Sequence, residues 1–257
     1  MSFGLPVHSS GATRIICLIP ARKGSKGVSR KNLRRVGLMT LVGRAIKVAR
    51  GLNFPTHVIL SSDDESILAK YSNKVDTCIK RRPDLSADNS LISDVILDSL
   101  LHLPNLSDSD ILVLLEPSSP NRTVEDINAA ISLMIENKYD SLITVSVLEA
   151  KYHPYKVLKP NYEGLLIEPF ISNAPKISNR QEIQNFALVK NGVAYIYKVG
   201  IARTSKSGLP VSSHFSITQR PVANIDSELD LWLSRYLHLR DLINSLKVDK
   251  WRRKLDS

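Results

Sequence analysis

Short apolar runs alternate with amphipathic segments over the first 150 residues of the chain. Five runs have the length and the Val, Ile and Leu content of buried strands, and they occupy residues 14–20, 57–61, 75–79, 111–115 and 141–147. Four segments have apolar residues at helical spacing, at 41–52, 64–71, 91–103 and 124–136. Right-handed crossovers join strands that alternate with helices into a parallel sheet, so the pattern predicts an α/β fold with helices on both faces.

The regular alternation stops after Val147. Residues 151–189 are rich in Pro, Asn and Tyr, which is typical of a functional lid or a dimerisation arm. A strand is predicted again at 192–197, and a helix with an apolar stripe from 228 to about 246. We therefore expect one domain over residues 13–245, with a protruding dimerisation and substrate arm at 151–189 and terminal extensions at 1–12 and 246–257.

Composition is that of a compact globular protein. Apolar residues make up 43% of the 257, which is enough to fill a sizeable core. No run of about 18 apolar residues predicts a membrane span, and the first dozen residues lack the pattern of a signal peptide. Cys17 and Cys78 fall in predicted strands without metal-ligand spacing, so we expect two buried free thiols. Together these features predict a cytoplasmic protein.

The net charge of +10 predicts an anionic partner. Positive charge concentrates at residues 22–35 and 247–254, and the second cluster fits the solvated end of a helix. No aromatic residues are interleaved with the basic loop, and no nucleic-acid-binding motif occurs. We therefore expect neither nucleic acid nor membrane as a partner.

A basic loop with two glycines follows the first predicted strand directly. It reads Pro20-Ala-Arg-Lys-Gly-Ser-Lys-Gly-Val-Ser-Arg-Lys-Asn32. Ligands of open α/β sheets bind at the carboxyl ends of strands, where backbone N–H groups and cations hold phosphate oxygens. The loop matches neither GxxxxGK[ST] nor GxGxxG. It predicts a polyphosphate site, with a solvated basic loop as the alternative.

An ordered series of motifs from about Ile15 to Leu239 resembles the acylneuraminate cytidylyltransferases, also called CMP-sialic acid synthetases. The opening signature is Ile-Pro-Ala-Arg-x-Gly-Ser-Lys-Gly followed by Arg-Lys-Asn. The later motifs are Ser61-Ser-Asp-Asp-Glu65, Arg82-Pro-Asp-Leu-Ser-Ala-Asp88, Glu116-Pro-Ser-Ser-Pro-Asn-Arg122, His153-Pro-Tyr-Lys156, Asn179-Arg-Gln181, Asn191-Gly192 with Tyr195, and Ile225-Asp-Ser-Glu-Leu-Asp-Leu231. The resemblance implies a Rossmann-like nucleotide-diphospho-sugar transferase fold and a homodimer. It also implies transfer of CMP from CTP to a nine-carbon acidic sugar: N-acetylneuraminic, legionaminic or pseudaminic acid.

The resemblance also implies roles for individual residues. The implied catalytic residues are Arg22, Lys26, Lys31 and Asp226. The implied nucleotide-binding residues are Ala21, Arg22, Gly24, Ser25, Lys26, Asn32, Arg82, Asp88 and Ser90. The implied substrate-binding residues are Glu116, Lys156, Arg180, Asn191 and Tyr195. Asp226 with Asn224 would hold Mg²⁺ (or Mn²⁺), although the position of Asp226 taken alone favours the cap of the following helix.

Two residues depart from the family pattern inside the site. Asn224 stands where the family usually has an aspartate, which removes one carboxylate from the expected metal site. Glu116 stands where glutamine is usual, and an acid beside an acidic sugar indicates either a raised pKa or a donor group, such as an amino or acylamino group, on the substrate. Two alternatives remain open: an eight-carbon ulosonic acid as substrate, and a weak or inactive relative that binds nucleotide.

Overall fold

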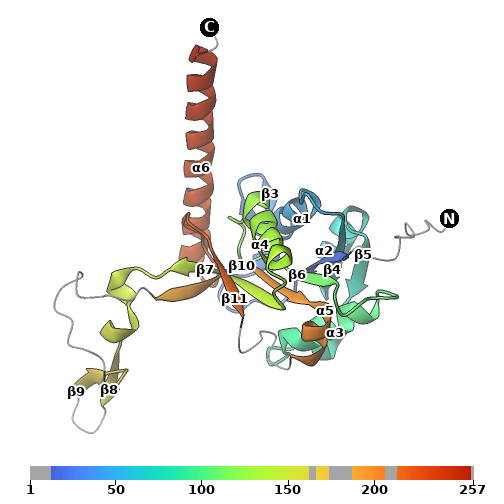
Figure 1. Cartoon of the computed structure of the whole chain (residues 1–257), viewed down its shortest axis with the longest axis horizontal. Helices are drawn as coiled ribbons and strands as arrows, with labels where there is room; N and C mark the ends of the chain where they lie inside the picture. The colour runs from blue at the N-terminus through green and yellow to red at the C-terminus, as the bar shows by residue number, and fades with distance from the viewer. Residues whose placement is uncertain (1–12, 162–165, 174–186, 206–212, 256–257) are drawn as a thin grey trace.

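The computed structural model describes residues 13–161, 166–173, 187–205 and 213–255, with no side chains described for 161, 166 or 247–255. Its centre is a seven-stranded sheet of order β11-β7-β10-β6-β1-β4-β5 (Figure 1). The strands are β1 (Ile15–Pro20), β4 (Thr56–Ser62), β5 (Thr77–Lys80), β6 (Ile111–Leu114), β7 (Ser141–Val147), β10 (Leu188–Lys198) and β11 (His214–Ile217). The α/β fold with a mainly parallel sheet is thereby confirmed.

Helices cover both faces of this sheet. One core cluster joins the inner strands to α1 (Leu41–Arg50), α2 (Glu65–Tyr71) and α4 (Val124–Glu136). A second cluster, on the other face, joins the sheet to α3 (Ile92–Leu101) and α5 (Val199–Thr204). The last helix, α6 (Glu228–Leu255), begins beside the domain and extends away from it (Figure 1). No helix in the described parts of the chain is long and apolar enough to cross a membrane.

One central strand is antiparallel to the others. β10 lies between β6 and β7 and pairs antiparallel with both, while β11 adds parallel to β7 at the edge. The parallel pattern predicted from the first 150 residues does not include β10, which the structure adds as an antiparallel strand. β10 pairs directly with β7 in antiparallel orientation, an arrangement that needs no crossover helix between the two strands.

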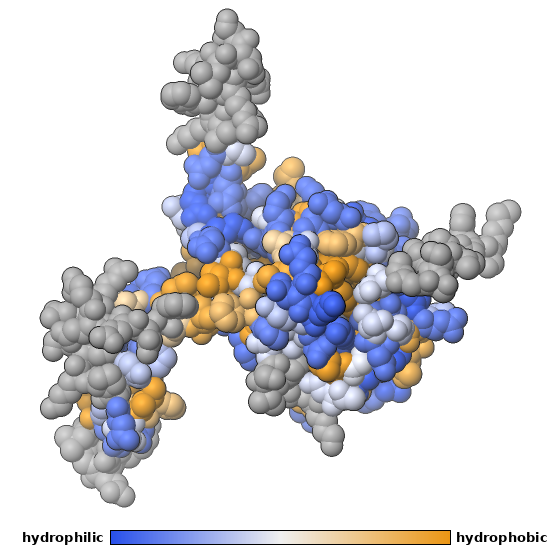
Figure 2. All heavy atoms as spheres, viewed as in Figure 1, coloured by the Kyte–Doolittle hydropathy of each residue, from blue (hydrophilic) through white to orange (hydrophobic). Residues whose placement is uncertain are grey.

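The predicted arm contains regular structure. β8 (Leu158–Asn161) and β9 (Leu166–Pro169) form an antiparallel pair that stands apart from the main sheet in Figure 1. A second small pair, β2 (Arg35–Val36) with β3 (Met39–Thr40), precedes α1. Hydrophobic surface gathers where the arm leaves the domain (Figure 2), and Val147, Val189 and Phe215 are among the exposed apolar residues of the adjoining strands. Such a surface is typical of an interaction site.

The two cysteines differ, contrary to the expectation that both are buried. Cys17 is in the central strand β1, and burial raises the pKa of its thiol to about 12. Cys78 lies on the edge strand β5 and is exposed, because the strand's alternation turns Ile79 inward instead. We predict that a thiol reagent such as dithionitrobenzoate modifies one thiol per chain in native buffer and two in denaturant. Two fast-reacting native thiols would contradict the burial of Cys17.

Candidate functional site

A cavity of about 520 Å³ opens at the carboxyl ends of β1 and β6. One wall is the basic loop after β1, and the opposite wall is the segment from Leu85 to Val95. Glu116, Pro117 and Ser118 follow β6 at the floor, and Asp226 enters from the segment before α6. The predicted site residues that line this cavity are Arg22, Ser25, Lys26, Lys31, Asn32, Asp88, Ser90, Glu116 and Asp226.

The basic loop and the opposite wall are joined by one carboxylate. Asp88 accepts a hydrogen bond from Arg22 Nη1 at 2.8 Å and forms an ion pair with Lys26 Nζ at 2.9 Å. Hydrogen bonds from Lys26 and Arg22 lower the pKa of the Asp88 carboxyl. Asn32 donates from its side chain to the Arg22 carbonyl at 2.8 Å, which fixes the base of the loop. Two cations thus meet at one anion in the cavity mouth, and a phosphate reaching them competes with Asp88.

Lys31 connects the basic loop to the segment before α6. Its Nζ donates to the Ile225 carbonyl at 2.7 Å and lies 3.4 Å from Asp226 Oδ1. The backbones of these two segments are also close, since a Cβ added at Gly27 would lie 1.8 Å from the Asp226 carbonyl oxygen. The two segments therefore hold each other in position at the cavity.

Asp226 is not the cap of α6. Ser227 accepts from the Asp230 backbone N–H at 3.3 Å, and Asp230 Oδ2 accepts from the Ser227 N–H at 2.8 Å. This reciprocal pair satisfies the first turn of the helix. The Asp226 side chain is 78% exposed, and Lys31 is its only ion-pair partner among the described residues. Its carboxylate is therefore available to a ligand in the cavity.

Glu116 has a carboxylate without a hydrogen bond or ion pair to any described residue. It lies partly buried in the cavity wall, and burial raises the pKa of its carboxyl, although Arg122 and Lys31 act in the opposite direction. Arg122 lies behind it and donates to the Glu116 and Gly192 carbonyls. Burial lowers the pKa of Arg122 to about 10, and two of its nitrogens, Nε and Nη1, have no partner among the described residues.

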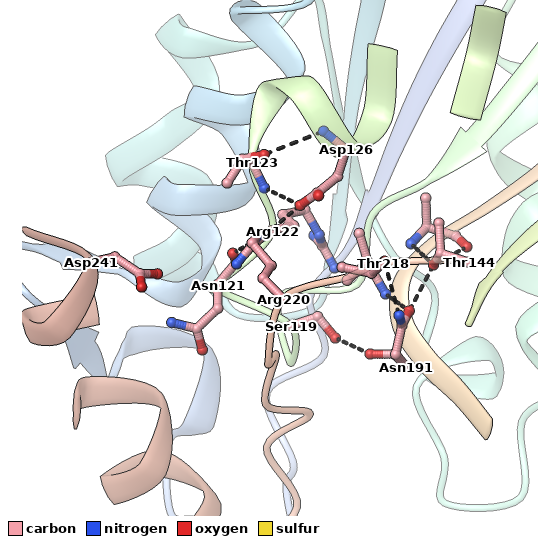
Figure 3. A network of polar contacts seen from close by, with 12 residues as sticks. Ser119, Asn121, Arg122, Thr123, Asp126, Thr144, Asn191, Thr218, Arg220 and Asp241 are labelled. Carbon is pink, nitrogen blue, oxygen red and sulfur yellow. Dashed lines mark hydrogen bonds and ion pairs between the residues drawn. The ribbon is translucent and has the colours of Figure 1, made fainter. Parts of the chain in front are cut away.

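Asn191 and Asn224 have side chains engaged within the protein. Asn191 bonds with Thr144, Ser146 and Thr218, as Figure 3 shows for Thr144 and Thr218. Asn224 Oδ1 lies 3.4 Å from Ser119 Oγ, and Asn224 is not among the residues that line the cavity. Asn191 therefore shapes the strand beside the cavity, and Asn224 would have to turn to reach a metal beside Asp226.

The other predicted residues that the structure describes lie outside the cavity. Ala21 is buried behind the loop, Gly24 lies in the loop, and Tyr195 is half-buried on β10, where burial raises its pKa to about 12. Lys156 is exposed at the base of the arm. Arg180 falls outside the described residues.

Arg81 lines the cavity, and its neighbour Arg82 does not. Arg81 is 6% exposed and donates to the Ser61 carbonyl at 2.9 Å and to Ser61 Oγ at 3.1 Å. Arg82 is exposed and lies 3.3 Å from Asp84. Arg81 was not among the residues predicted from the sequence. The alternation of β5 could have indicated it, because Ile79 and Arg81 share the inward-facing phase of that segment.

Comparison with known proteins matches most of the chain to one family. One family, described as "Cytidylyltransferase", matches residues 16–236. Post-translational flagellin modification protein B of Campylobacter coli is 29% identical over 231 residues, covering 88% of this chain and 95% of that protein. CMP-N,N'-diacetyllegionaminic acid synthase of Campylobacter jejuni subsp. jejuni serotype O:2 is 28% identical, covering 87% and 94%.

Two further proteins share part of the sequence or the fold. N-acylneuraminate cytidylyltransferase of Streptococcus agalactiae serotype V is 28% identical over 183 residues, which span 70% of this chain but only 42% of that longer protein. The solved structure of CMP:2-keto-3-deoxy-manno-octonic acid synthetase complexed with CTP superposes with a TM-score of 0.67 at 16% identity, covering 89% of this chain and 100% of that one. This last similarity concerns the fold.

Proposed function

The chain belongs to the cytidylyltransferase family and is a nucleotidyltransferase, and from this premise we propose that it transfers CMP from CTP to a nine-carbon sialic-acid-type sugar, releasing pyrophosphate. The observation that carries the proposal is the cavity after β1, where Arg22, Lys26 and Lys31 converge. A triphosphate and a sugar acid are both anionic, and a pocket with several cations suits the two together. We propose a cytoplasmic enzyme that acts as a homodimer through the arm.

In this proposal the basic loop binds the triphosphate. Arg22 and Lys26 hold its phosphates after Asp88 releases them, and Asn32 keeps the loop in place through the Arg22 carbonyl. The anomeric hydroxyl of the sugar attacks the α-phosphorus in line, and Lys31 stabilises the negative charge that develops there. The cytosine and ribose would lie along the Leu85–Val95 wall, which includes Ser90.

A divalent cation, Mg²⁺ or Mn²⁺, fits the oxygen donors of this cavity. Asp226 offers an exposed carboxylate beside Lys31, and phosphate oxygens and water would complete the coordination. When bound, such an ion neutralises phosphate charge and supports the leaving pyrophosphate. We retain Asn224 as a candidate ligand that requires its side chain to turn from Ser119.

The sugar would lie toward Glu116 and the arm. Glu116 is unpartnered among the described residues and lines the cavity, so a donor group on the sugar would satisfy it. Lys156, Arg180, Asn191 and Tyr195 remain proposed contacts of the sugar or of its immediate surroundings. Two relatives, an N-acylneuraminate cytidylyltransferase and a CMP-N,N'-diacetyllegionaminic acid synthase, support nine-carbon acids with acylamino groups.

Analysis of the reaction products tests the proposal. We expect incubation with CTP, Mg²⁺ and the correct sugar acid to yield a CMP-sugar, identified by its mass, in an amount equal to the pyrophosphate released. UTP, ATP and GTP in place of CTP provide the control. Equal turnover with all four nucleotides, or hydrolysis of CTP without a sugar product, would refute it.

Replacing Glu116 with glutamine is expected to change the choice of sugar. If the carboxylate accepts from a donor on the substrate, Glu116→Gln lowers kcat/KM for that sugar roughly 10- to 100-fold, as expected for loss of a charge-assisted hydrogen bond. Initial rates with each acid measure the effect, and the KM for CTP is the internal control. An unchanged preference among the acids would remove Glu116 from the sugar site.

The two adjacent arginines can be separated experimentally. We expect Arg81→Ala to raise the dissociation constant of CTP roughly 10-fold or more, because it removes a buried cation from the cavity. Arg82→Ala, at the exposed neighbour, is expected to change it less than about threefold. Calorimetric titration with CTP measures both, with thermal unfolding to check that each variant is folded. A larger effect of Arg82→Ala than of Arg81→Ala would instead place Arg82 in the CTP site, as the family resemblance indicates.

A further inference from the structure

The first half of α6 is attached to the domain along one face. Leu231, Ser234 and Leu237 are buried there, at a spacing of three residues. The Ser234 carbonyl and hydroxyl both bond with the Asn121 side chain, and Arg34 forms a two-point ion pair with Glu228. After Leu237 no described residue of α6 is buried, although the helix continues to Leu255. Figure 1 shows this part standing clear of the domain.

An apolar stripe runs along the opposite face of the same helix. Six large side chains recur at alternating spacings of three and four residues over three heptads, and all are between 42% and 78% exposed: Leu229, Trp232, Tyr236, Leu239, Ile243 and Leu246. These are the a and d positions of a seven-residue repeat. Leu233 and Leu242 extend the stripe on its two sides and are also exposed.

This pattern needs a partner that the described residues of one chain do not supply. A helix standing clear of its domain gains little stability from its own hydrogen bonds in water, and most helical stability comes from burial of an apolar face. Scattered exposed apolar residues are ordinary, but a continuous exposed stripe marks an interaction site. Here the stripe continues past the last domain contact, so it does not serve to attach α6 to its own domain.

We propose that the exposed stripe of α6 packs against the α6 helix of a second copy of this chain, as a two-stranded coiled coil. Side chains at a and d positions pack between the a and d side chains of a partner helix with the same repeat. The α6 helix of a second copy has the same repeat over the same length. Eight half-exposed large side chains offer a contact on the order of the ~800 Å² per partner that a standard interface buries. The contact is separate from the arm and does not rest on the proposed reaction.

The flanking charges leave the stripe open to another helix. Arg235 donates from Nε to the Arg35 carbonyl, and Arg240 is paired with Asp241 of the same turn. Arg235 is thus engaged by β2, and Arg240 is engaged within the helix. The paired helices would also stiffen the start of α6, which begins two residues after Asp226, so the contact would support the segment that Lys31 holds at the cavity.

Cysteine trapping tests the contact directly. In full-length protein with Cys78→Ser, which removes the exposed native thiol, we would introduce Tyr236→Cys and Leu239→Cys in the stripe and Asn244→Cys outside it. Parallel helices bring each stripe cysteine opposite itself, and antiparallel helices with their stripes in full overlap bring residue 236 opposite residue 239. Mild oxidation of the single variants and of their mixture is expected to give a covalent dimer of about 57 kDa, twice the 28.6 kDa chain. The Asn244→Cys control is expected to stay at 28.6 kDa. Dimer no more abundant than in the control would overturn the proposal.

Two negative charges introduced into the stripe provide an independent test. Leu239→Glu with Ile243→Glu places two carboxylates in the seam, whereas Asn244→Glu with Ser245→Glu places the same charge on exposed positions beside it. We expect the first variant to raise the dissociation constant of the largest assembly seen in sedimentation equilibrium at least tenfold, whether or not the arm also joins the chains, with the second variant unchanged. Circular dichroism checks that both are folded. A monomeric native protein, or equal dissociation constants in the two variants, would also overturn the proposal.

Discussion

Lys31→Ala is expected to lower kcat for CMP transfer roughly 100- to 1,000-fold, the usual effect of removing one preorganised donor from a developing negative charge. Lys31 is the cation that contacts both the Ile225 carbonyl and the Asp226 carboxylate, so its loss also releases the segment before α6. The KM for CTP is expected to rise less than kcat falls, because Arg22 and Lys26 still bind the phosphates. Steady-state kinetics in both substrates measures the two effects.

Lys23→Ala provides the matched control for this variant. Lys23 lies in the same loop and carries the same charge, but its side chain does not line the cavity. Its replacement is expected to leave kcat within about twofold, in keeping with the small effects of most surface substitutions. Equal losses in both variants would mean that the total charge of the loop matters and the position of Lys31 does not.

Gly27→Ala is expected to impair both folding stability and catalysis. The added methyl group would lie 1.8 Å from the Asp226 carbonyl oxygen and 3.0 Å from its carbonyl carbon, so two backbone segments must move apart. Overpacking of this kind costs about 1–3 kcal/mol of unfolding free energy. A displacement of about 1 Å at a catalytic group also lowers activity roughly 100-fold. Denaturant unfolding and steady-state kinetics measure the two losses.

Gly24→Ala tests whether the effect comes from the collision. A Cβ at Gly24 meets no atom within 4 Å, in the same loop and three residues away. Its unfolding free energy is expected to stay within about 0.5 kcal/mol of the native value. Equal destabilisation by both substitutions would indicate a general sensitivity of the loop and would contradict the close contact at Gly27.

Much of the fold follows from the apolar pattern alone. The helix at Val124–Glu136 and the strand at Ser141–Val147 have the predicted bounds, because each has a clear period and clear ends. The direction of β10 and the pairing of β11 could not be predicted, since a buried strand shows the same pattern whichever way it runs. The β8–β9 pair has strands of only four residues, each containing a proline, and short strands outside the main core leave little periodicity.

The sequence indicates where the cavity lies, but not which side chains contact one another in it. A basic loop at the carboxyl end of the first strand is sufficient to place the cavity, and most of the implied nucleotide residues line it. The pairing of Asp88 with Arg22 and Lys26 spans 62 to 66 residues of sequence, so no local pattern could indicate it. The cap of α6 could not be predicted either, because Asp226 and Ser227 are adjacent and only the structure shows that the Ser227 side chain accepts from the first turn of the helix.

Pyrophosphate release from CTP and Mg²⁺ with a panel of sugar acids tests the central claim most directly. The panel comprises N-acetylneuraminic, legionaminic and pseudaminic acids, an eight-carbon ulosonic acid, and a reaction without sugar. The proposed function predicts release that depends on one of the nine-carbon acids and is lost in Lys31→Ala. Release with only the eight-carbon acid, or none with any acid despite measurable CTP binding, would contradict it.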